Sequence, residues 1–389
     1  MDNFEFMSPT KFILEKDADL LCGSEVKKIS DNVLFVHYGD NFTYESGLHA
    51  RITKALEEAG VTCYELPGVE PNPKVDLVRK GIELCKKHTI GCILAAGGGS
   101  VIDTAKAVGI GAKYDGDVWD FYSKKAVPTG SLPVGTIMTL PATGSEGSNG
   151  SVIKNPETGE SADVMADFIR PVFTLMNPDL TLTVPKRQTV FGIIDMFSHV
   201  LERYFSSSVN TYLTDYLCEG VMKSILVNAK ALMKDLKDYN ARAELMWTSI
   251  VAHNGLLATG RNQDWATHTI GVQLGAQYNC VHGATLSVLF PNWAKYVYKE
   301  NLPRFVQFAN RVFGIEIDLY DQEKTALEGI EKMAEFFHSM GGPATLADLG
   351  VENDEKIRQM AEDACRFGSI GGLKALDADD VEAIYRLSM

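Results

Sequence analysis

Hydrophobic and polar residues follow two patterns along the first 180 residues, and each pattern predicts one kind of element. Short apolar runs bounded by Gly, Asn or Pro predict β-strands, and apolar positions three or four residues apart predict amphipathic helices. Strands are expected at 32–38, 61–66, 91–98, 134–140 and 171–180, and helices at 44–60 and 73–88. This βαβαβ order is typical of a parallel sheet covered by helices, so the fold class expected for this part is α/β.

The pattern changes near residue 184, where the strand signals largely stop. The rest of the chain is a succession of amphipathic segments, separated by breaks such as 260–261 and 340–350. A chain of 389 residues is also too long for one ordinary core. We therefore expect an α/β domain at 1–183 and an all-helical domain at 184–389. A cleft between two such domains is a favoured place for a ligand.

A glycine-rich turn joins the predicted strand at 91–98 to a helix. Its sequence is GGGS at 97–100. Glycines let the backbone approach a bound group closely, and the N–H groups at the start of a helix point toward that group, so a phosphate is the natural occupant. The usual dinucleotide fingerprint is incomplete, because Ile102 stands where its final Gly belongs. A plain strand-to-helix turn is the alternative, and the long apolar strand before the turn favours the phosphate.

Asp40 directly follows the first predicted strand, 32–38. In nucleotide-binding sheets, an acidic residue in such a place can accept hydrogen bonds from the adenosine ribose hydroxyls and repel a 2′-phosphate. An Asp in this position can instead cap the next helix or form an Asx-turn. The sequence leaves both interpretations open.

The stretch FGIIDMFSHVLERYF at 191–205 has the apolar stripe of a buried helix. Asp195 and His199 lie within it, and a helix places positions i and i+4 on one face. Because a buried carboxylate needs a partner, the two residues either bond to each other or to another side chain, or bind a metal ion together.

Two further histidines, His268 and His282, lie in the stretch 261–290. Added to the pair at 195 and 199, they give one carboxylate and three imidazoles. This set suits a divalent transition metal and leaves a coordination position for substrate. The spacing alone does not place these histidines beside the pair, so a buried hydrogen-bonded pair remains the alternative.

Composition and charge narrow the classes of function. The chain has 37 Lys and Arg against 51 Asp and Glu, a formal net charge of −14, which disfavours nucleic-acid and anionic-lipid partners. No apolar run reaches the roughly 18 residues that span a bilayer, and MDNFEFMSPTKF is not expected to be a signal peptide. The seven cysteines form no CxxC pair, so we expect reduced thiols in a cytoplasmic protein.

Six motifs occur in an order that resembles one known family. They are GGGSVIDTAK (97–106), TLPATGSE (139–146), NPDLTLTVP (177–185), IIDMFSHVLERY (193–204), DWATH (264–268) and HG (282–283). Together they resemble the iron-containing (group III) alcohol dehydrogenases, particularly the butanol dehydrogenase and aldehyde reductase branch, over essentially the whole chain. The resemblance implies a dehydroquinate synthase-like architecture, with a dinucleotide-binding α/β domain and a helical domain that binds metal and substrate.

The resemblance also implies roles for individual residues. The cofactor is expected to contact the adenosine-side residues Asp40, Asn72 and Leu180, the pyrophosphate-binding residues Gly98, Gly99 and Ser100, and the cleft residues Thr139 and Thr143. The expected metal ligands are Asp195, His199, His268 and His282, and the expected substrate pocket includes Asn149, Trp265 and Val272. The family implies Fe²⁺, and the same ligand set accepts Zn²⁺.

The sequence departs from the family pattern at three places. The family often has a second histidine four residues after the one that matches His268, with a proposed role in proton transfer, and Val272 stands there. A lysine found near the nicotinamide ribose in some relatives is Ser161 here. NADP-using members of this branch tend to have Gly and Ser where this chain has GDN at 39–41, which favours NAD(H) over NADP(H).

The function implied by the resemblance is hydride transfer between a nicotinamide cofactor and a small aldehyde or primary alcohol, with the metal ion as Lewis acid. A non-redox lyase of the dehydroquinate synthase type is the alternative, but it needs a cationic pocket, and Arg261 is the only basic residue near the expected ligands. A binding protein without catalysis is a third candidate, against which the complete ligand set argues. We expect a homo-oligomer, a dimer or larger, with strands from FEFMSPTKFILEKD at the interface.

Overall fold

The computed structural model describes residues 1–389, which form two compact units. The α/β unit consists of Met7–Val184 and Lys237–Ile250, and the helical unit consists of Met1–Phe6, Pro185–Leu236 and Val251–Met389. Residues 1–6 thus belong with the helical unit and residues 237–250 with the α/β unit. The expected domains, 1–183 and 184–389, divide the chain at one point, whereas the two units also share out these two short segments.

Six parallel strands form the sheet of the α/β unit, in the order β1-β8-β5-β4-β2-β3. The strands are β1 (Lys11–Leu14), β2 (Asn32–His37), β3 (Thr62–Leu66), β4 (Cys92–Gly97), β5 (Val134–Met138) and β8 (Phe173–Met176). Residues of β2 and β4 are buried on both sides, which is why these strands read as continuous apolar runs. The expected α/β class with a parallel sheet is confirmed.

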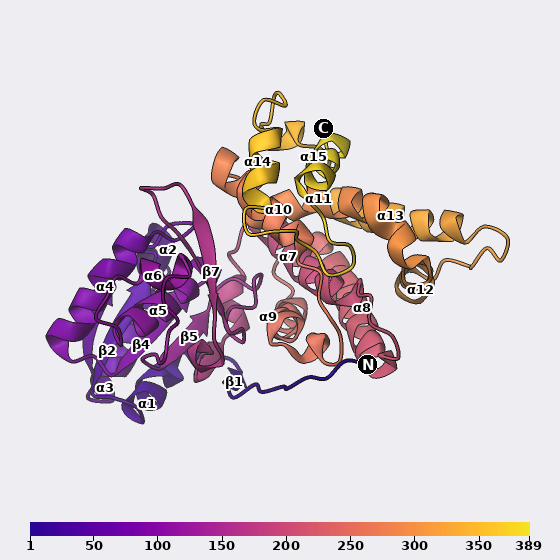
Figure 1. Ribbon diagram of the computed structural model, residues 1–389. Coiled ribbons are helices and arrows are strands. Elements are labelled where there is room, and N and C mark those ends of the chain that lie inside the picture. Colours follow the sequence, from indigo (N-terminus) through magenta and orange to yellow (C-terminus); the bar gives the residue numbers. More distant parts are fainter. The chain divides into compact units, whose positions relative to one another are not determined.

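Helices cover both faces of this sheet (Figure 1). Val33 and Phe35 of β2 face a core built with α1 (Cys22–Lys27) and α3 (Leu48–Glu58). Leu34 and Val36 face the opposite core, built with α4 (Val75–His88), α5 (Gly99–Gly111) and α6 (Trp119–Tyr122). Successive residues of a strand point to opposite faces, so one apolar run supplies both cores.

Two parts of the α/β unit differ from the expected elements. The single helix expected at 44–60 is divided into α2 (Asn41–Glu45) and α3, because Gly47 between them has a φ of 79° that does not continue a helix. The stretch after the expected strand at 134–140 contains an antiparallel pair, β6 (Gly150–Lys154) and β7 (Ser161–Met165), that the sequence did not predict.

The helical unit is built almost entirely of α-helices. They are α7 (Lys186–Tyr204), α8 (Tyr212–Lys234), the end of α9 (Tyr239–His253), α10 (Ala266–Tyr278), α11 (His282–Val297), α12 (Leu302–Phe313), α13 (Gln322–Ser339), α14 (Ile357–Ala364) and α15 (Ala378–Leu387). The first residues of the chain are anchored here, since the Met1 amino group donates to Val209 O at 2.6 Å. No helix has the length and apolar character required to cross a membrane.

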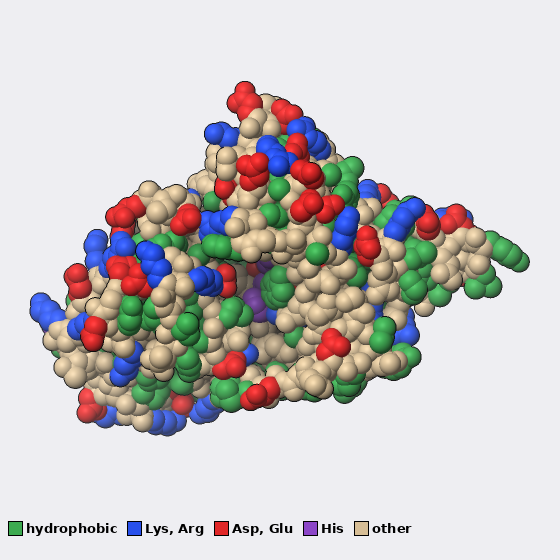
Figure 2. Space-filling model, viewed as in Figure 1, with side chains coloured by type: hydrophobic (Ala, Val, Ile, Leu, Met, Phe, Trp, Pro, Cys, Tyr) green, Lys and Arg blue, Asp and Glu red, His purple; other side chains and the backbone are tan.

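Charged side chains of both signs are interspersed over the face drawn in Figure 2. Apolar side chains gather at the end of the segment between α12 and α13, where Leu319 and Tyr320 are strongly exposed. The face in view thus offers no extended cationic surface of the kind that binds nucleic acid.

Candidate active site

The core of the candidate site lies on α7. Residues Thr189–Tyr204 of this helix are all buried, so apolar packing holds the helix on every side. Asp195 and His199 lie one turn apart on it, as their spacing predicted, and each side chain is 4% exposed. The fold therefore fixes both side chains in a buried position.

Two other helices bring further histidines to the same place. His268 lies in the first turn of α10, and His282 is the first residue of α11. Asp195 Oδ1 lies 3.8 Å from the Nε2 of His199, 3.8 Å from that of His268 and 3.6 Å from that of His282. Ligand atoms about 2.1 Å from a tetrahedral ion lie about 3.4 Å from one another, so this spacing suits a bound metal ion.

The buried polar atoms of this cluster lack hydrogen-bond partners. Asp195 Oδ1 and His268 Nε2, which lie 3.8 Å apart, are both buried and unpartnered, which is costly for polar atoms unless another species satisfies them. A carboxylate with imidazoles is a donor set that Fe²⁺ and Zn²⁺ accept. The residues present therefore fit a divalent metal ion.

The protonation states of the histidines also suit this interpretation. Burial lowers the pKa of His199 and of His282, so both rings are neutral near pH 7 and have a free lone pair. Burial would lower the pKa of His268 too, but the nearby carboxylates of Asp195 and Glu202 raise it to about 9. A metal ion at His268 therefore displaces a proton.

One side of the cluster is open to solvent. The His282 side chain is 32% exposed, against 4% for Asp195 and 11% for His268. Trp265 and Val272 are the expected substrate-pocket residues of the helical unit. Trp265 lies three residues before His268, and Val272 lies four residues after it. The Trp265 ring lies 5.0 Å from that of His268. An apolar wall beside a partly exposed ligand is suitable for a small alcohol or aldehyde.

Sequence reasoning missed two residues of this site. Glu202 contacts His268, with its Oε1 2.6 Å from the ring Nδ1, and its place seven residues after Asp195 on α7 could have revealed it. His253 was not predicted either, and its ring centroid lies 4.1 Å from that of His199. No local pattern signals His253, because it comes from the end of a different helix.

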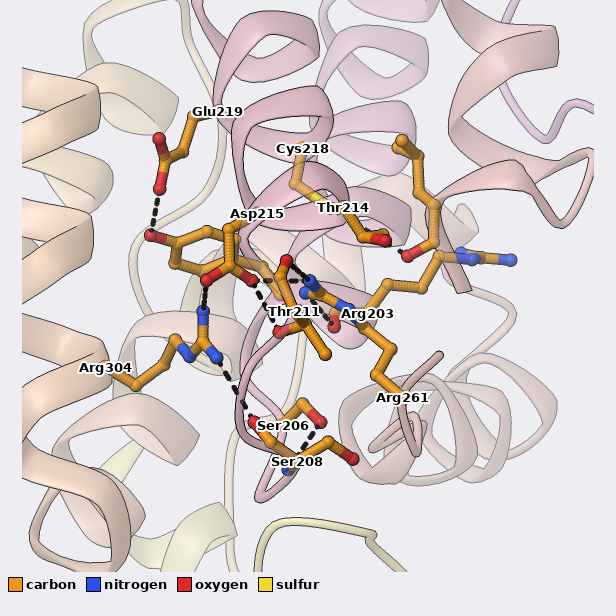
Figure 3. Close-up of polar contacts among 12 residues, drawn as sticks. Arg203, Ser206, Ser208, Thr211, Thr214, Asp215, Cys218, Glu219, Arg261 and Arg304 are labelled. Carbon is orange, nitrogen blue, oxygen red and sulfur yellow. Dashed lines mark hydrogen bonds and ion pairs between the residues drawn. The ribbon is translucent and has the colours of Figure 1, made fainter. Parts of the chain in front are cut away.

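A buried ionic network lies beyond the carboxyl-terminal end of α7 (Figure 3). Asp215 accepts from Arg261 at 2.5 Å and pairs with Arg304 at 2.6 Å. Arg261 also donates to the carbonyl oxygen of Arg203. The guanidinium of Arg203 in turn donates to the carbonyl oxygen of His199. Arg261, the basic residue expected near the ligands, is thus committed to Asp215. It is not the only basic residue there, because Arg203 lies one turn after His199 and packs over the Trp265 ring.

The glycine turn of the α/β unit lies at the carboxyl end of β4. Gly98 precedes α5, and its N–H donates to the Tyr38 hydroxyl at 3.3 Å. A Cβ on Gly99 would lie 2.6 Å from the Thr143 hydroxyl oxygen, so only glycine permits this approach. Ser100 follows in the first turn of α5. The structure thus brings together the expected pyrophosphate residues and Thr143, on one edge of the sheet.

A buried lysine holds the loop that carries Thr143. Lys106 of α5 is fully buried and donates to Ser145, Ser148 and Gly150 at 2.7–3.2 Å. Burial lowers the pKa of this lysine to about 8. The loop is therefore fixed to α5 next to the glycine turn.

Asp40 caps α2. Its Oδ1 accepts from the Thr43 backbone N–H at 2.9 Å and from the Thr43 hydroxyl at 2.7 Å, and the residue is exposed. The capping interpretation of Asp40 is therefore correct, and one oxygen makes both of these bonds. A role of the other oxygen in cofactor choice stays a prediction.

The remaining expected residues lie at separate places in the α/β unit. Thr139 follows β5 and is buried, and its N–H donates to Gly97 O at 3.3 Å. Asn72 precedes α4 with a φ of 57°. Leu180 is partly buried and packs against the core that contains α1 and α3. The Asn149 amide donates to Asp167 at 3.1 Å.

A second group of possible metal ligands, His37, His49 and Glu65, is better explained without an ion. The Gly39 N–H donates to His37 Nδ1 at 3.1 Å, so the neutral ring carries its proton on Nε2. That nitrogen lies 3.5 Å from Glu65, which also pairs with His49 at 3.0 Å. A protonated Nε2 has no lone pair for a metal.

A parallel sheet with a glycine turn at its carboxyl edge, together with a carboxylate–imidazole cluster on buried helices, is typical of a nucleotide-dependent metal dehydrogenase. Residues 9–178 match the family model for iron-containing alcohol dehydrogenases, and residues 189–389 match the model for the carboxyl-terminal part of that family. The chain belongs to the iron-containing alcohol dehydrogenase family, as its motifs indicated.

Several relatives are similar over 90–100% of the chain. "Probable NADH-dependent butanol dehydrogenase 1" of Bacillus subtilis is 42% identical, with 100% of both chains covered. The NADPH-dependent aldehyde reductase YqhD of Escherichia coli is 30% identical, with 90% of each chain covered. The crystal structure of NADH-dependent butanol dehydrogenase A from Thermotoga maritima has a TM-score of 0.95 and 35% identity, and covers 100% of this chain and 99% of that one.

Proposed function

We propose that this protein is a metal-dependent alcohol dehydrogenase and aldehyde reductase. It transfers hydride between a nicotinamide cofactor and a small aldehyde or primary alcohol. The observation that carries the proposal is that Asp195 Oδ1 lies within 3.8 Å of the Nε2 atoms of three histidines, His199, His268 and His282. The names of similar proteins, butanol dehydrogenases and an aldehyde reductase, support the same chemistry.

These four residues would hold the metal ion, and the glycine turn would hold the cofactor pyrophosphate. When bound, the metal supplies a Lewis acid for the substrate oxygen, and the nicotinamide supplies or accepts hydride. His199 and His282 can ligate without first losing a proton, because burial lowers their pKa. The Trp265 indole would limit the substrate to a small apolar group beside His268.

Fe²⁺ is the ion we propose, with Zn²⁺ as the ion that the same donors also accept. The family name supports iron. One carboxylate with three imidazoles does not by itself select between the two ions.

NAD(H) is the cofactor we propose in preference to NADP(H). Asp40 uses only Oδ1 to cap α2, which leaves Oδ2 to accept from the ribose hydroxyls and to repel a 2′-phosphate. Four similar proteins are named as NADH-dependent butanol dehydrogenases.

We further propose a cytoplasmic homo-oligomer, a dimer or larger. All seven cysteines are unpaired, which suits a reducing compartment. Strand β1 pairs with β8 alone, so its other edge is available to a second copy. Met7 and Leu14 beside this edge are exposed apolar residues.

Oxidation of NADH with a panel of short aldehydes tests the proposed reaction. We expect turnover by the wild-type protein, loss of turnover after chelation, and recovery with Fe²⁺ or Zn²⁺. His268→Ala should lose both metal and activity but still bind NADH, because the glycine turn is untouched. His338→Ala, a change of the same type on α13, is the control and should retain activity. Full activity in His268→Ala would refute the metal assignment.

A further inference from the structure

Glu202 lies on the same side of α7 as Asp195 and His199. The three residues occupy positions i, i+4 and i+7, which a helix stacks along one side. Glu202 is fully buried, and an ionised carboxylate is costly to bury unless donors surround it. The donors around Glu202 therefore indicate what it does.

Those donors come from one short segment, residues 265–268, at the start of α10. Oε2 accepts from the Trp265 backbone N–H at 2.7 Å. Oε1 accepts from the His268 backbone N–H at 3.1 Å, from its ring Nδ1 at 2.6 Å, and from the Thr267 hydroxyl. Trp265, the N-cap residue of α10, makes no side-chain cap of its own. Glu202 therefore caps this helix from α7, and its charge suits the positive end of the helix dipole.

The short bond to Nδ1 determines which nitrogen of His268 faces the cluster. A carboxylate only accepts hydrogen bonds, so Nδ1 carries a proton and Nε2 is the nitrogen left for a metal. His268 Nε2 lies 3.8 Å from Asp195 Oδ1, and both atoms are buried without a hydrogen-bond partner. One carboxylate thus fixes both the tautomer and the orientation of a histidine that comes from another helix.

We propose that Glu202 is a positioning residue of the metal centre, which holds His268 Nε2 toward Asp195 and so raises the affinity for a divalent transition metal. The inference rests on the proposed function, because it takes His268 and Asp195 as ligands. Loss of such a partner typically lowers metal affinity about tenfold to a hundredfold. If Glu202 only caps α10, its loss changes stability alone.

Glu219 provides a matched control on α8. It is buried, and it accepts from the Tyr204 hydroxyl at 2.8 Å and from Gln307 at 3.0 Å. Figure 3 shows it beside Asp215, in the ionic network beyond the end of α7. Glu219→Gln therefore removes one buried, hydrogen-bonded charge from the same unit without removing a partner of any proposed ligand.

Cobalt binding by the full-length proteins tests the proposal. Co²⁺ affinity is measured by competition with a chromophoric chelator for wild type, Glu202→Gln and Glu219→Gln, together with the visible absorption of bound Co²⁺ and the thermal unfolding of the metal-free proteins. We expect Glu202→Gln to bind Co²⁺ at least about tenfold more weakly, with an altered absorption spectrum. Glu219→Gln should keep the wild-type affinity and spectrum, even if both variants unfold at a lower temperature. Wild-type affinity and spectrum in Glu202→Gln would overturn the proposal.

A second measurement needs no Glu202 variant to fold. In the Zn²⁺-loaded protein labelled with nitrogen-15 at histidine, the His268 ring signals are assigned by their absence in His268→Ala. We expect the proton on Nδ1 and the metal on Nε2, and a proton on Nε2 would overturn the proposal. A wild-type protein that binds neither Co²⁺ nor Zn²⁺ would refute the metal centre as well, a result distinct from unchanged metal binding in Glu202→Gln.

Discussion

The carboxylate of Asp40 has two oxygens, and the fold uses one of them. Oδ1 accepts both hydrogen bonds from Thr43 that cap α2. Capping and cofactor choice are therefore not exclusive explanations of this residue, and a substitution that separates them is more informative than simple removal.

Asp40→Asn keeps an oxygen for the cap and removes the charge, whereas Asp40→Gly removes both. A carboxylate facing a 2′-phosphate costs about 1–3 kcal/mol, or about tenfold to a hundredfold in affinity. We expect both variants to narrow the ratio of kcat/KM for NADH over NADPH, mainly by improving NADPH use. Loss of the cap should lower the free energy of unfolding by only a few tenths of a kcal/mol in Asp40→Gly, as is typical for a Gly N-cap. Measuring kcat/KM with NADH and with NADPH for wild type and both variants tests this prediction. An unchanged ratio would show that Asp40 only caps α2.

Some site residues were predictable from the sequence and others were not. Asp195 and His199 were predictable from helical spacing, because positions i and i+4 meet in any α-helix. His268 and His282 lie fourteen residues apart on different helices, so only their motifs assigned them to the pair. His253 was not predictable, because its contact with His199 depends on tertiary packing that no local pattern encodes.

Among the elements, the contact between α7 and α11 depends on one missing side chain. A Cβ on Gly283 would lie 2.1 Å from the carbonyl oxygen of Phe191. The start of α11 therefore lies against the backbone of α7, one turn before Asp195. His282 is the residue before Gly283, and in this position its Nε2 lies 3.6 Å from Asp195 Oδ1.

Gly283→Ala should move the start of α11 away from α7 and so increase the distance between His282 and Asp195. We expect a destabilisation of about 1–3 kcal/mol, the usual cost of overpacking, and weaker metal binding. Chemical unfolding of the metal-free protein and Co²⁺ titration measure the two effects. Gly220→Ala on α8 is the control, because a Cβ there meets nothing within 4 Å and Ala stabilises an exposed helix by about 0.5–1 kcal/mol relative to Gly. Wild-type metal affinity in Gly283→Ala would contradict this account of the contact.

The central strands were the most predictable elements. Strands buried on both faces must be apolar at every position, so β2 and β4 are recognisable without their partners. The hairpin of β6 and β7 was missed because its residues, GSVIK and SADVM, are mixed in polarity and only partly buried. The break at Gly47 was missed because the apolar spacing continues across it, while the backbone does not.

On the scale of the whole molecule, the edge of β1 leads to a prediction about assembly. We expect a mass of at least twice 42.7 kDa by light scattering. Leu14→Lys should shift the mass toward that of one chain, because it places a charge beside the unpaired edge. Leu319→Lys, at an exposed apolar position of the helical unit, should leave the mass unchanged. A wild-type mass near 42.7 kDa at all concentrations would refute the oligomer.

The spacing of Asp195, His199 and Glu202 also determines which changes of chain length α7 can accept. Each residue of an α-helix advances by about 100° around its axis. Deletion or insertion of one residue between Asp195 and Glu202 would therefore turn one functional group away from the others, whatever residue was lost or gained. The exposed segment around Tyr320 carries no such angular relation. Variation among natural or engineered sequences should accordingly change length at that segment, and α7 should change only by replacement of one residue with another.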